Sequence, residues 1–522
     1  MKNTVQKLRL TAPAVGFGAM TGAVTALVVV VYKWCAKWAI TGAEHGYHWL
    51  RGHWWAVPLV IGALGGVALL LSKVYRREPN LRGGGIPTAI GILRGQIPFR
   101  WLATLLGTFG LSLLSFLIGV PLGNEGPSVQ IGTAVGRGSV SLSKRHAAWD
   151  RYAMTGGACA GFAVATGAPI SGVLVAVEEA HRRVSPTIFI AACTSVLCAG
   201  LTNEAVSPLF GVSTSLFPSM SPAPLSLREA WLPLAVGAIV GLFAVAFLQY
   251  YRLLSHFFHK TLHTVCSVWK IWFVLVATVV VGLVTFSGVS TGHELVLSLF
   301  EGGTALWLLA VLLIVRTTLT LCANVNHITG GIFLPLLAIG ALLAAILGEG
   351  VALLPALGRE YYPVVLMLGI TACISGMMRM PLTAIVFAVE ALSGYHHILY
   401  VILTAATAFV ITELFGAESI NDRVLEHRVA SLNKQHHRRV IDTTVTVQEG
   451  AFAVGRAVRD IFWPNGLFVL SVRSADNTPA DGLRAGDVLH VRYAADETTA
   501  ARQALVAVVG EQEYEEPEAA DE

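Results

Sequence analysis

Hydrophobic residues form a succession of long runs over the first four fifths of the chain, separated by short polar segments. A helix needs about 20 apolar residues to cross a bilayer, and several of these runs are shorter or contain glycine or proline. Short, interrupted apolar segments are typical of membrane proteins with a binding site near the bilayer midplane. The pattern predicts an all-α polytopic membrane protein. Its runs lie at about 11–32, 55–74, 101–121, 152–179, 186–203, 230–250, 271–287, 304–323, 331–355, 363–378, 381–392 and 397–416.

Charge divides the chain into two parts. Residues 417–522 carry 29 of the 68 charged side chains and a net charge of −7, whereas residues 1–416 have a net charge of +11. The whole chain is 54% hydrophobic and 13% charged, and a soluble fold cannot cover so much apolar surface with so few charges. A cytosolic enzyme and a disordered protein are therefore excluded. We expect no enzymatic activity, and a membrane body followed by an acidic soluble domain.

The basic leader, residues 1–10, precedes an apolar run of about 22 residues, Thr11 to Tyr32. This run is too long for the core of a signal peptide, so we expect a retained first transmembrane helix. The positive-inside rule then places the leader in the cytoplasm. The 7 cysteines lie outside the acidic tail and lack metal-ligand spacing, so we expect buried apolar side chains and no metal site.

Two pairs of segments about 210 residues apart indicate an internal duplication. Residues 168–178 and 380–390 share proline, alanine, valine and glutamate at equivalent positions. Pro127–Gly132 matches Pro335–Gly340 in the same way. Chance similarity between apolar helices is the alternative. The predicted repeats span about 11–205 and 228–416.

Three segments rich in glycine, each with a proline, stand where apolar helices are expected to begin. Glycine permits a tight turn, and proline suits the first helical turn. A helix N-terminus presents free N–H groups and about half a positive charge, so three such ends aimed at one point would bind an anion. Each could instead simply start a helix at a loop. The anion-binding candidates are Gly83, Gly84, Gly85, Ile86, Gly123, Gly126 and Gly331, with Pro87, Pro127 and Pro335 in structural roles.

Glu125 lies inside the second of these segments. A charged side chain within a membrane costs about 2.5–3.5 kcal/mol or more, so its default interpretation is functional. Among helix N-termini, the charged carboxylate would occupy the place of the anion. Once protonated, it would lose that attraction and admit an anion, which couples a proton to an anion. The alternative is a carboxylate that caps its own helix.

Glu178 and Glu179 are adjacent and lie about 100° apart on a helix. The duplication aligns Glu178 with Glu390, which predicts a shared structural role, such as a hydrogen bond to the backbone at a helix end. Glu179 is aligned with Ala391 and has no equivalent acid. This asymmetry makes Glu179 the better candidate for a proton relay.

Taken together, these motifs resemble those of the CLC family of chloride channels and transporters. The likeness extends from roughly residue 15 to residue 428, and its motifs occur in the order found in the family. It implies inverted repeats of tilted helices and a homodimer with a separate anion pathway in each subunit. The motifs are Gly83–Pro87, Gly123–Pro127, Ala168–Glu179 and Gly330–Pro335.

The resemblance also implies roles for individual residues. Glu125 corresponds to the external gating glutamate of the family. Glu179 matches the internal proton glutamate that is found in many of its antiporters and is usually absent from its channels. The backbone amides of Ile332 and Phe333 would line the anion site.

The chain departs from the family pattern at three positions. Gly84 replaces a serine whose hydroxyl coordinates the central anion, and Asn421 stands where a tyrosine usually supplies another hydroxyl. Asn124 replaces a basic residue before the gating glutamate. Loss of two hydrogen bonds to an anion, at about 1.5–3 kcal/mol each, predicts weaker anion binding. Pro127 stands where the fluoride-exporting branch typically has threonine, so fluoride ranks below chloride.

The tail is predicted to be a small α+β domain. Period-two patterning predicts strands at 440–447, 467–472 and 488–493, and helical runs at 452–461 and 498–509. Two of its segments, 449–455 and 483–489, resemble the C-terminal ligand-binding domain of RCK-type regulators of potassium transport. That likeness implies paired domains with a small ligand or nucleotide between them. The alternative is a domain that stabilises a dimer without a ligand.

The sequence thus predicts a proton-coupled antiporter for chloride or a similar monovalent anion, in the inner (plasma) membrane with both termini cytoplasmic. A passive anion channel is the main alternative, favoured by the missing hydroxyls. A ligand sensor that signals through its tail, and a fluoride/proton antiporter, rank lower. We expect no cofactor besides the bound anion and no nucleic-acid partner. The predicted parts are a 1–10 leader, an 11–428 transport domain, a 429–438 linker, a 439–511 cytosolic domain and a 512–522 disordered acidic tail.

Overall fold

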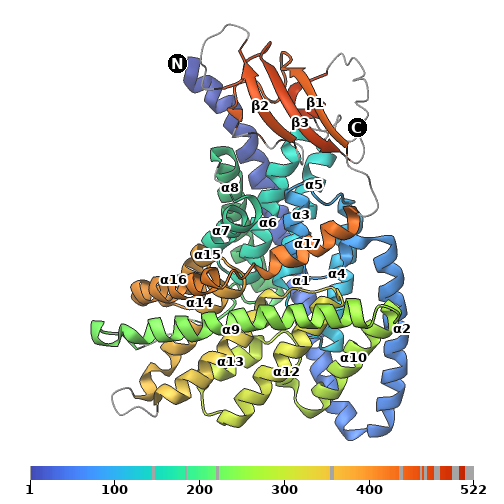
Figure 1. The fold of residues 1–522 in the computed structure, drawn as a ribbon, viewed down its shortest axis with the longest axis vertical. Coiled ribbons are helices and arrows are strands. Elements are labelled where there is room, and N and C mark those ends of the chain that lie inside the picture. Colours follow the sequence, from blue (N-terminus) through green and yellow to red (C-terminus); the bar gives the residue numbers. More distant parts are fainter. Residues whose placement is uncertain are drawn as a thin grey trace.

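The computed structural model is a helical body with a small sheet at one end (Figure 1). It describes all residues except 1, 144–146, 183–184, 219–222, 353–357, 434–438, 459–460, 462, 464–466, 475–481, 496–504 and 512–522. The first eight helices are α1 (Lys2–Gly52), α2 (Val57–Arg77), α3 (Ile86–Leu93), α4 (Trp101–Ile118), α5 (Glu125–Leu142), α6 (Asp150–Thr166), α7 (Pro169–Val175) and α8 (Pro186–Val206). The next are α9 (Trp231–His256), α10 (Ser267–Val284), α11 (His293–Glu301), α12 (Leu306–Val325), α13 (Phe333–Ala352), α14 (Tyr362–Met377), α15 (Pro381–Ala391), α16 (Ile398–Leu414) and α17 (Ile420–Asn433).

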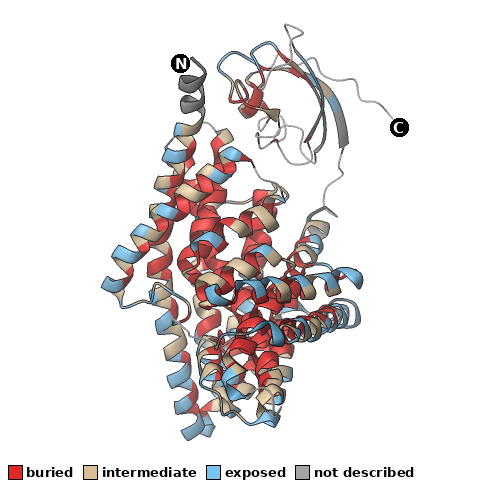
Figure 2. Cartoon of the chain, turned by 90° about the vertical axis from the view of Figure 1, so that its left-hand side faces the viewer, coloured by how far each residue is buried: buried red, intermediate tan, exposed pale blue. Residues whose placement is uncertain are grey.

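The helices confirm a polytopic membrane fold. Among the described residues, 10 helical segments are long and apolar enough to cross a membrane. By contrast, α3, α7, α11 and α15 have only 7 to 11 residues and are too short to span the hydrocarbon core. Exposed leucines, valines and tryptophans cover the outer helices, while buried residues fill the interior (Figure 2). Such an apolar outer surface suits contact with lipid.

The two repeats contact each other through α7 and α15, which pack together. Glu390, on α15, accepts hydrogen bonds from the backbone N–H groups of Ile170 and Ser171 at 2.7 and 2.9 Å. Glu178, just after α7, accepts equivalent bonds from Leu382 and Thr383 at 3.0 and 2.9 Å. Each glutamate therefore satisfies the free N–H groups at the start of the partner repeat's short helix.

This reciprocal arrangement makes stability predictions for Glu390→Ala and Glu178→Ala. Each change leaves two backbone donors at a helix N-terminus without an acceptor, so we expect each to lower the free energy of unfolding by about 1–3 kcal/mol. Denaturant unfolding in detergent micelles measures the loss. The exposed Glu360 provides the control, because Glu360→Ala should change stability by less than about 0.5 kcal/mol. Equal stability of all three variants would contradict this role.

Helices α5 and α6 pack backbone against backbone. A Cβ on Gly132 would overlap the carbonyl oxygen of Gly157, and a Cβ on Gly157 would overlap the carbonyl oxygen of Gly132. Only glycine allows this approach, which is common between helices in membranes. The contact fixes the position of α5, whose first residue is Glu125.

The tail contains a three-stranded antiparallel sheet with the order β1-β3-β2, formed by β1 (Arg439–Thr446), β2 (Leu467–Arg473) and β3 (Val488–Ala495). Its strands agree with the patterning of the sequence. On the exposed side, Arg492 of β3 donates two hydrogen bonds to Asp442 of β1, each 2.7 Å long. These bonds hold the pKa of the Asp442 carboxyl below its usual range.

Two of our predictions for the chain were wrong. Residues 452–455 form turns instead of a helix, because Ala453 N–H donates to the Val508 carbonyl and Gly455 N–H donates to the Leu483 carbonyl. The positive φ of Gly455, 79°, also breaks the helical path. Not all cysteines are buried: Cys266 is exposed, since it lies just before α10 in a connecting segment. Of the second predicted helical run, residues 498–504 lie outside the described residues and 505–509 are helical.

The tail contacts the body near the start of α6. The ring of Phe452 lies 5.1 Å from the ring of Trp149 and 5.9 Å from that of Tyr152, measured between centroids. Arg151 donates a hydrogen bond to the Trp463 carbonyl. The Arg456 guanidinium lies 3.8 Å from the centre of the Phe452 ring. The beginning of α1 lies at the same end of the body as the sheet (Figure 1).

Candidate functional site

The three glycine-rich segments converge at one point. A Cβ on Gly85, which precedes α3, would overlap the backbone of Gly126 in the first turn of α5. A Cβ on Gly126 would overlap the Gly84 carbonyl and would lie 2.8 Å from the Cα of Gly331, which precedes α13. The N-termini of α3, α5 and α13 therefore meet with no side chains between their backbones.

Backbone hydrogen bonds lock this meeting point. Gly123 and Gly331 exchange two N–H to carbonyl bonds of 2.6 and 2.7 Å, which form an isolated antiparallel bridge. Gly83 N–H donates to the His327 carbonyl at 2.9 Å. The first-turn N–H groups of a helix have no intrahelical acceptor, so each N-terminus contributes free donors and a partial positive charge. Converging donors of this kind can hold an anion or a carboxylate.

Glu125 places a carboxylate in this site. It is the first residue of α5 and is 0% exposed. Neither carboxylate oxygen makes a hydrogen bond of normal geometry, and the backbone amides of Glu125 and Leu334 face it from α5 and α13. The alternative of a simple helix cap is not seen, since neither Glu125 oxygen makes a hydrogen bond of normal geometry to the start of α5. The carboxylate thus lies among positively polarised helix N-termini and makes no hydrogen bond of normal geometry to them.

A lysine outside the predicted motifs acts on the same carboxylate. Lys33, on α1, donates hydrogen bonds to the carbonyls of Val164 and Ser213 at 3.0 and 2.9 Å. Its ammonium and the Glu125 carboxylate attract each other. Asn124, which precedes Glu125, is uncharged, so α1 supplies a positive charge that the local sequence lacks. Sequence reasoning missed Lys33 because no motif links it to Glu125.

The residues after Gly331 lie at the head of α13. Ile332 and Phe333 are both buried, at 1% and 0% exposure. The Phe333 ring packs edge-on against the rings of Phe162 and Phe387, with centroids 5.1 and 5.4 Å away. Pro335 and Pro127 stand in the first turns of α13 and α5, and Pro87 in that of α3, where proline costs no hydrogen bond. Ile86, the first residue of α3, is also buried.

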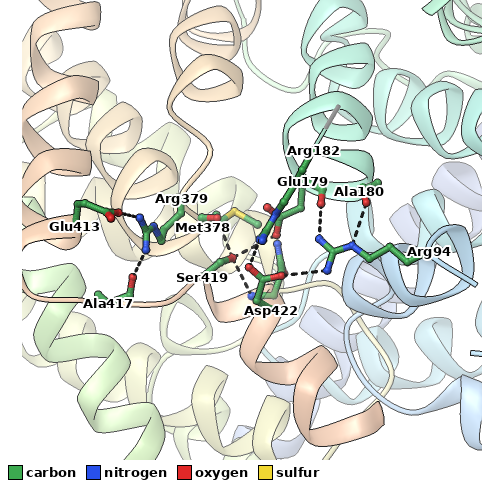
Figure 3. Close-up of polar contacts among 11 residues, drawn as sticks. Arg94, Glu179, Ala180, Arg182, Met378, Arg379, Glu413, Ala417, Ser419 and Asp422 are labelled. Carbon is green, nitrogen blue, oxygen red and sulfur yellow. Dashed lines mark hydrogen bonds and ion pairs between the residues drawn. The ribbon is translucent and has the colours of Figure 1, made fainter. Parts of the chain in front are cut away.

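The second acid, Glu179, lies in a different environment. It belongs to a π-helical segment, Ala176–His181, which continues α7, and it is 2% exposed. Ser419 donates a 3.3 Å hydrogen bond to its carboxylate (Figure 3). Arg94 donates to the backbone carbonyls of Glu179 and Ala180 at 2.8 and 3.0 Å. Short π-helical segments occur frequently at functional sites.

A charged cavity of about 690 Å³ adjoins Glu179. Asp422 accepts hydrogen bonds from Arg94, at 3.4 Å, and from Arg182 at its edge (Figure 3). Arg379 pairs with Glu413 on the far side. A polar cavity of this size can hold water beside Glu179. Its lining includes Arg94, Glu178, Glu179, Arg182, Arg379 and Asp422.

Asn421, the second residue of α17, lies beside Glu179. It is 1% exposed, and its side-chain amide faces the Glu179 carboxylate without a hydrogen bond of normal geometry. Both polar atoms of the amide are buried without a partner. The structure therefore brings Asn421 next to Glu179, and groups Gly83, Gly84, Gly85, Gly123, Gly126 and Gly331 around Glu125.

The family described as voltage gated chloride channel has a sequence model that matches residues 65–413. This chain belongs to the CLC family. The H(+)/Cl(−) exchange transporter ClcA of Klebsiella pneumoniae (strain 342) is 25% identical over 440 residues, which cover 82% of this chain and 92% of the relative. ClcA of Vibrio parahaemolyticus serotype O3:K6 (strain RIMD 2210633) is 30% identical over 405 residues, or 75% and 85% of the two chains.

Solved CLC structures share the fold. A slow cyanobacterial Cl⁻/H⁺ antiporter aligns with a TM-score of 0.72 at 23% identity, over 80% of this chain and 99% of that one. A CLC-type fluoride/proton antiporter aligns with a TM-score of 0.60 at 18% identity, over 77% and 95%. The inverted repeats of tilted and broken helices in this chain are thus those of the CLC family.

Proposed function

We propose that this CLC protein is a proton-coupled antiporter for chloride or a similar monovalent anion. The observation that carries the proposal is a pair of buried carboxylates in unlike settings. Glu125 lies among three helix N-termini without a hydrogen bond, and Glu179 lies beside a charged cavity. The curated relatives named above are H(+)/Cl(−) exchange transporters.

Glu125 and Glu179 have different roles in the exchange. Charged Glu125 fills the anion site and excludes an anion, since both are attracted by the same backbone donors. Protonation removes that attraction, the side chain leaves, and an anion takes its place. Glu179 takes up protons from the cavity and passes them toward Glu125. One proton is bound each time the side chain leaves the site and is released before the charged side chain returns, which couples the two flows.

Reconstitution in liposomes tests antiport directly. With an imposed chloride gradient, the protein should drive protons uphill, recorded by simultaneous chloride and pH electrodes. Chloride flux without any proton movement would support the passive channel instead. The absence of hydroxyl groups at Gly84 and Asn421 favours that alternative. Fluoride that outcompetes chloride in the same assay would favour the fluoride/proton antiporter, although Pro127 stands against it.

The assembly and orientation belong to the same proposal. The working unit is a homodimer in the inner membrane with both termini cytoplasmic, which is supported by the basic leader and by the start of α1 lying at the tail end of the body. The tail pairs across the dimer and binds a small ligand or nucleotide, as its likeness to RCK-type domains suggests. The ligand response of a chain lacking residues 436–522 tests this: an unchanged rate and response would remove the regulatory role.

Docking of the tail yields a prediction for Phe452→Ala. The change removes a ring buried between Trp149 and Tyr152, at a cost of about 1–3 kcal/mol. We expect limited proteolysis between body and tail to become about tenfold faster. Leu470→Ala is the matched control, since Leu470 is exposed on β2. Equal cleavage rates in both variants would show that Phe452 does not hold the tail in place.

A further inference from the structure

The space beside Gly84 is filled from elsewhere in the chain. Around the position of a Cβ on Gly84, the three nearest atoms are the Gly330 carbonyl oxygen at 3.6 Å, the Asn324 Nδ2 at 3.7 Å and the Pro87 Cδ at 3.8 Å. Of these, only the Asn324 amide is a side-chain hydrogen-bond donor. It lies 3.7 Å from the place where a side chain at position 84 would begin.

Asn324 comes from the last turn of α12, six residues before the glycine segment that leads into α13. It is 2% exposed, and its Oδ1 is buried without a hydrogen-bond partner. Asn326, two residues further along, has the opposite arrangement: its Nδ2 donates to the Cys322 carbonyl at 2.8 Å. Buried polar groups are rarely left unpaired in native structures. The unpaired atom is an acceptor and calls for a donor of its own, whereas the donor end of the same amide, Nδ2, is the end that lies 3.7 Å from a Cβ on Gly84.

A second unpaired amide belongs to Asn421. It too is buried, and its polar atoms make no hydrogen bond of normal geometry, although the amide faces the Glu179 carboxylate. Gly84 and Asn421 are the two positions at which the family's hydroxyl donors are missing. The chain thus lacks both hydroxyls yet buries two asparagine amides, one next to Gly84 and one at position 421 itself.

We propose that Asn324 is an anion ligand of this protein, whose side-chain N–H donates to the transported anion at the head of α3 in place of a hydroxyl at position 84. The inference rests on the proposed function. A primary amide carries two N–H donors and no charge. It can therefore hold a monovalent anion without the strong attraction of a cation, which would hinder release.

Chloride binding to the full-length protein in detergent, measured by isothermal titration calorimetry, tests the assignment. Asn324→Ala should raise the Kd for chloride about tenfold or more, because hydrogen bonds to a charged partner are the stronger kind. Asn326→Ala is the matched control and should leave the Kd within about twofold. Asn324→Asp, which has nearly the same shape but no N–H donors, should weaken binding as much as Asn324→Ala does.

A rescue separates ligation from a merely structural role. A Cβ at Gly84 meets its neighbours at ordinary van der Waals distances, so Gly84→Ser fits without displacement. Introduced into Asn324→Ala, it should restore most of the lost chloride affinity, and alone it should strengthen binding. If Asn324→Ala binds chloride weakly and the added Gly84→Ser change does not restore the affinity, the assignment is overturned.

The remaining outcomes are also decisive. If the wild-type protein binds chloride and both Asn324 variants bind it equally well, Asn324 is no ligand, while the proposed antiport stands. If the wild-type protein binds neither chloride nor another halide, the proposed function fails and the inference falls with it. Gel filtration of each variant confirms folding, and Asn324→Asp decides the matter if Asn324→Ala does not fold.

Discussion

Glu125→Gln should carry chloride without moving protons, at every pH. Glutamine keeps the shape of the protonated acid but cannot become an anion, so it never competes for the helix N-termini that surround it. In the wild-type protein, lower pH favours the protonated side chain and should raise chloride flux. In the variant, chloride flux should be flat with pH, and coupled proton flux should fall roughly 100-fold or more.

Simultaneous recording of chloride and pH in proteoliposomes measures both quantities. Glu294→Gln is the control, since Glu294 is an exposed acid at the start of α11; it should keep both the coupling and the pH dependence. A Glu125→Gln variant whose chloride flux still rises as pH falls would show that another group gates the anion site. The buried position of Glu125 between α5 and α13 would then need a different explanation.

Glu179→Gln should stop proton flux and spare chloride flux. The carboxylate is buried beside the charged cavity. Among the described residues, Ser419 is the only one whose side chain donates a hydrogen bond of normal geometry to it. Glutamine cannot carry a proton, so protons from the cavity no longer reach Glu125. We expect the proton flux to fall roughly 100-fold or more, while chloride flux changes less than about threefold.

The neighbouring acid offers a matched control for this experiment. Glu178→Gln alters a carboxylate that borders the same cavity, but whose oxygens already bind the N-terminus of α15. Glu178→Gln should lower the free energy of unfolding and leave the coupling of proton flux to chloride flux intact, whereas Glu179→Gln should do the reverse. If both variants lose coupling equally, the cavity as a whole supplies protons and Glu179 has no special part. Unchanged coupling in Glu179→Gln would mean that protons reach Glu125 by another path.

Much of the architecture followed from local sequence. Long apolar runs require membrane helices, because an unsatisfied backbone group in lipid is costly. The glycine segments could be located because the turns ahead of α3, α5 and α13 need residues without a Cβ. The match between Glu178 and Glu390 likewise indicated two equivalent hydrogen-bond acceptors. The alternation of apolar and polar residues predicted the strands of the tail correctly, whereas the turn at Gly455, which has a positive φ, broke the helix expected over 452–461.

Sequence alone determined that this chain is a duplicated membrane protein with a carboxylate set among helix N-termini, since apolar length, glycine and proline act on the backbone locally. Only the tertiary structure decided which side chains reach that carboxylate and the space beside Gly84. Lys33 lies on α1 and Asn324 on α12, and neither belongs to a motif. Their proximity arises from helices packed against one another across the fold, so no periodicity or spacing along the chain encodes it.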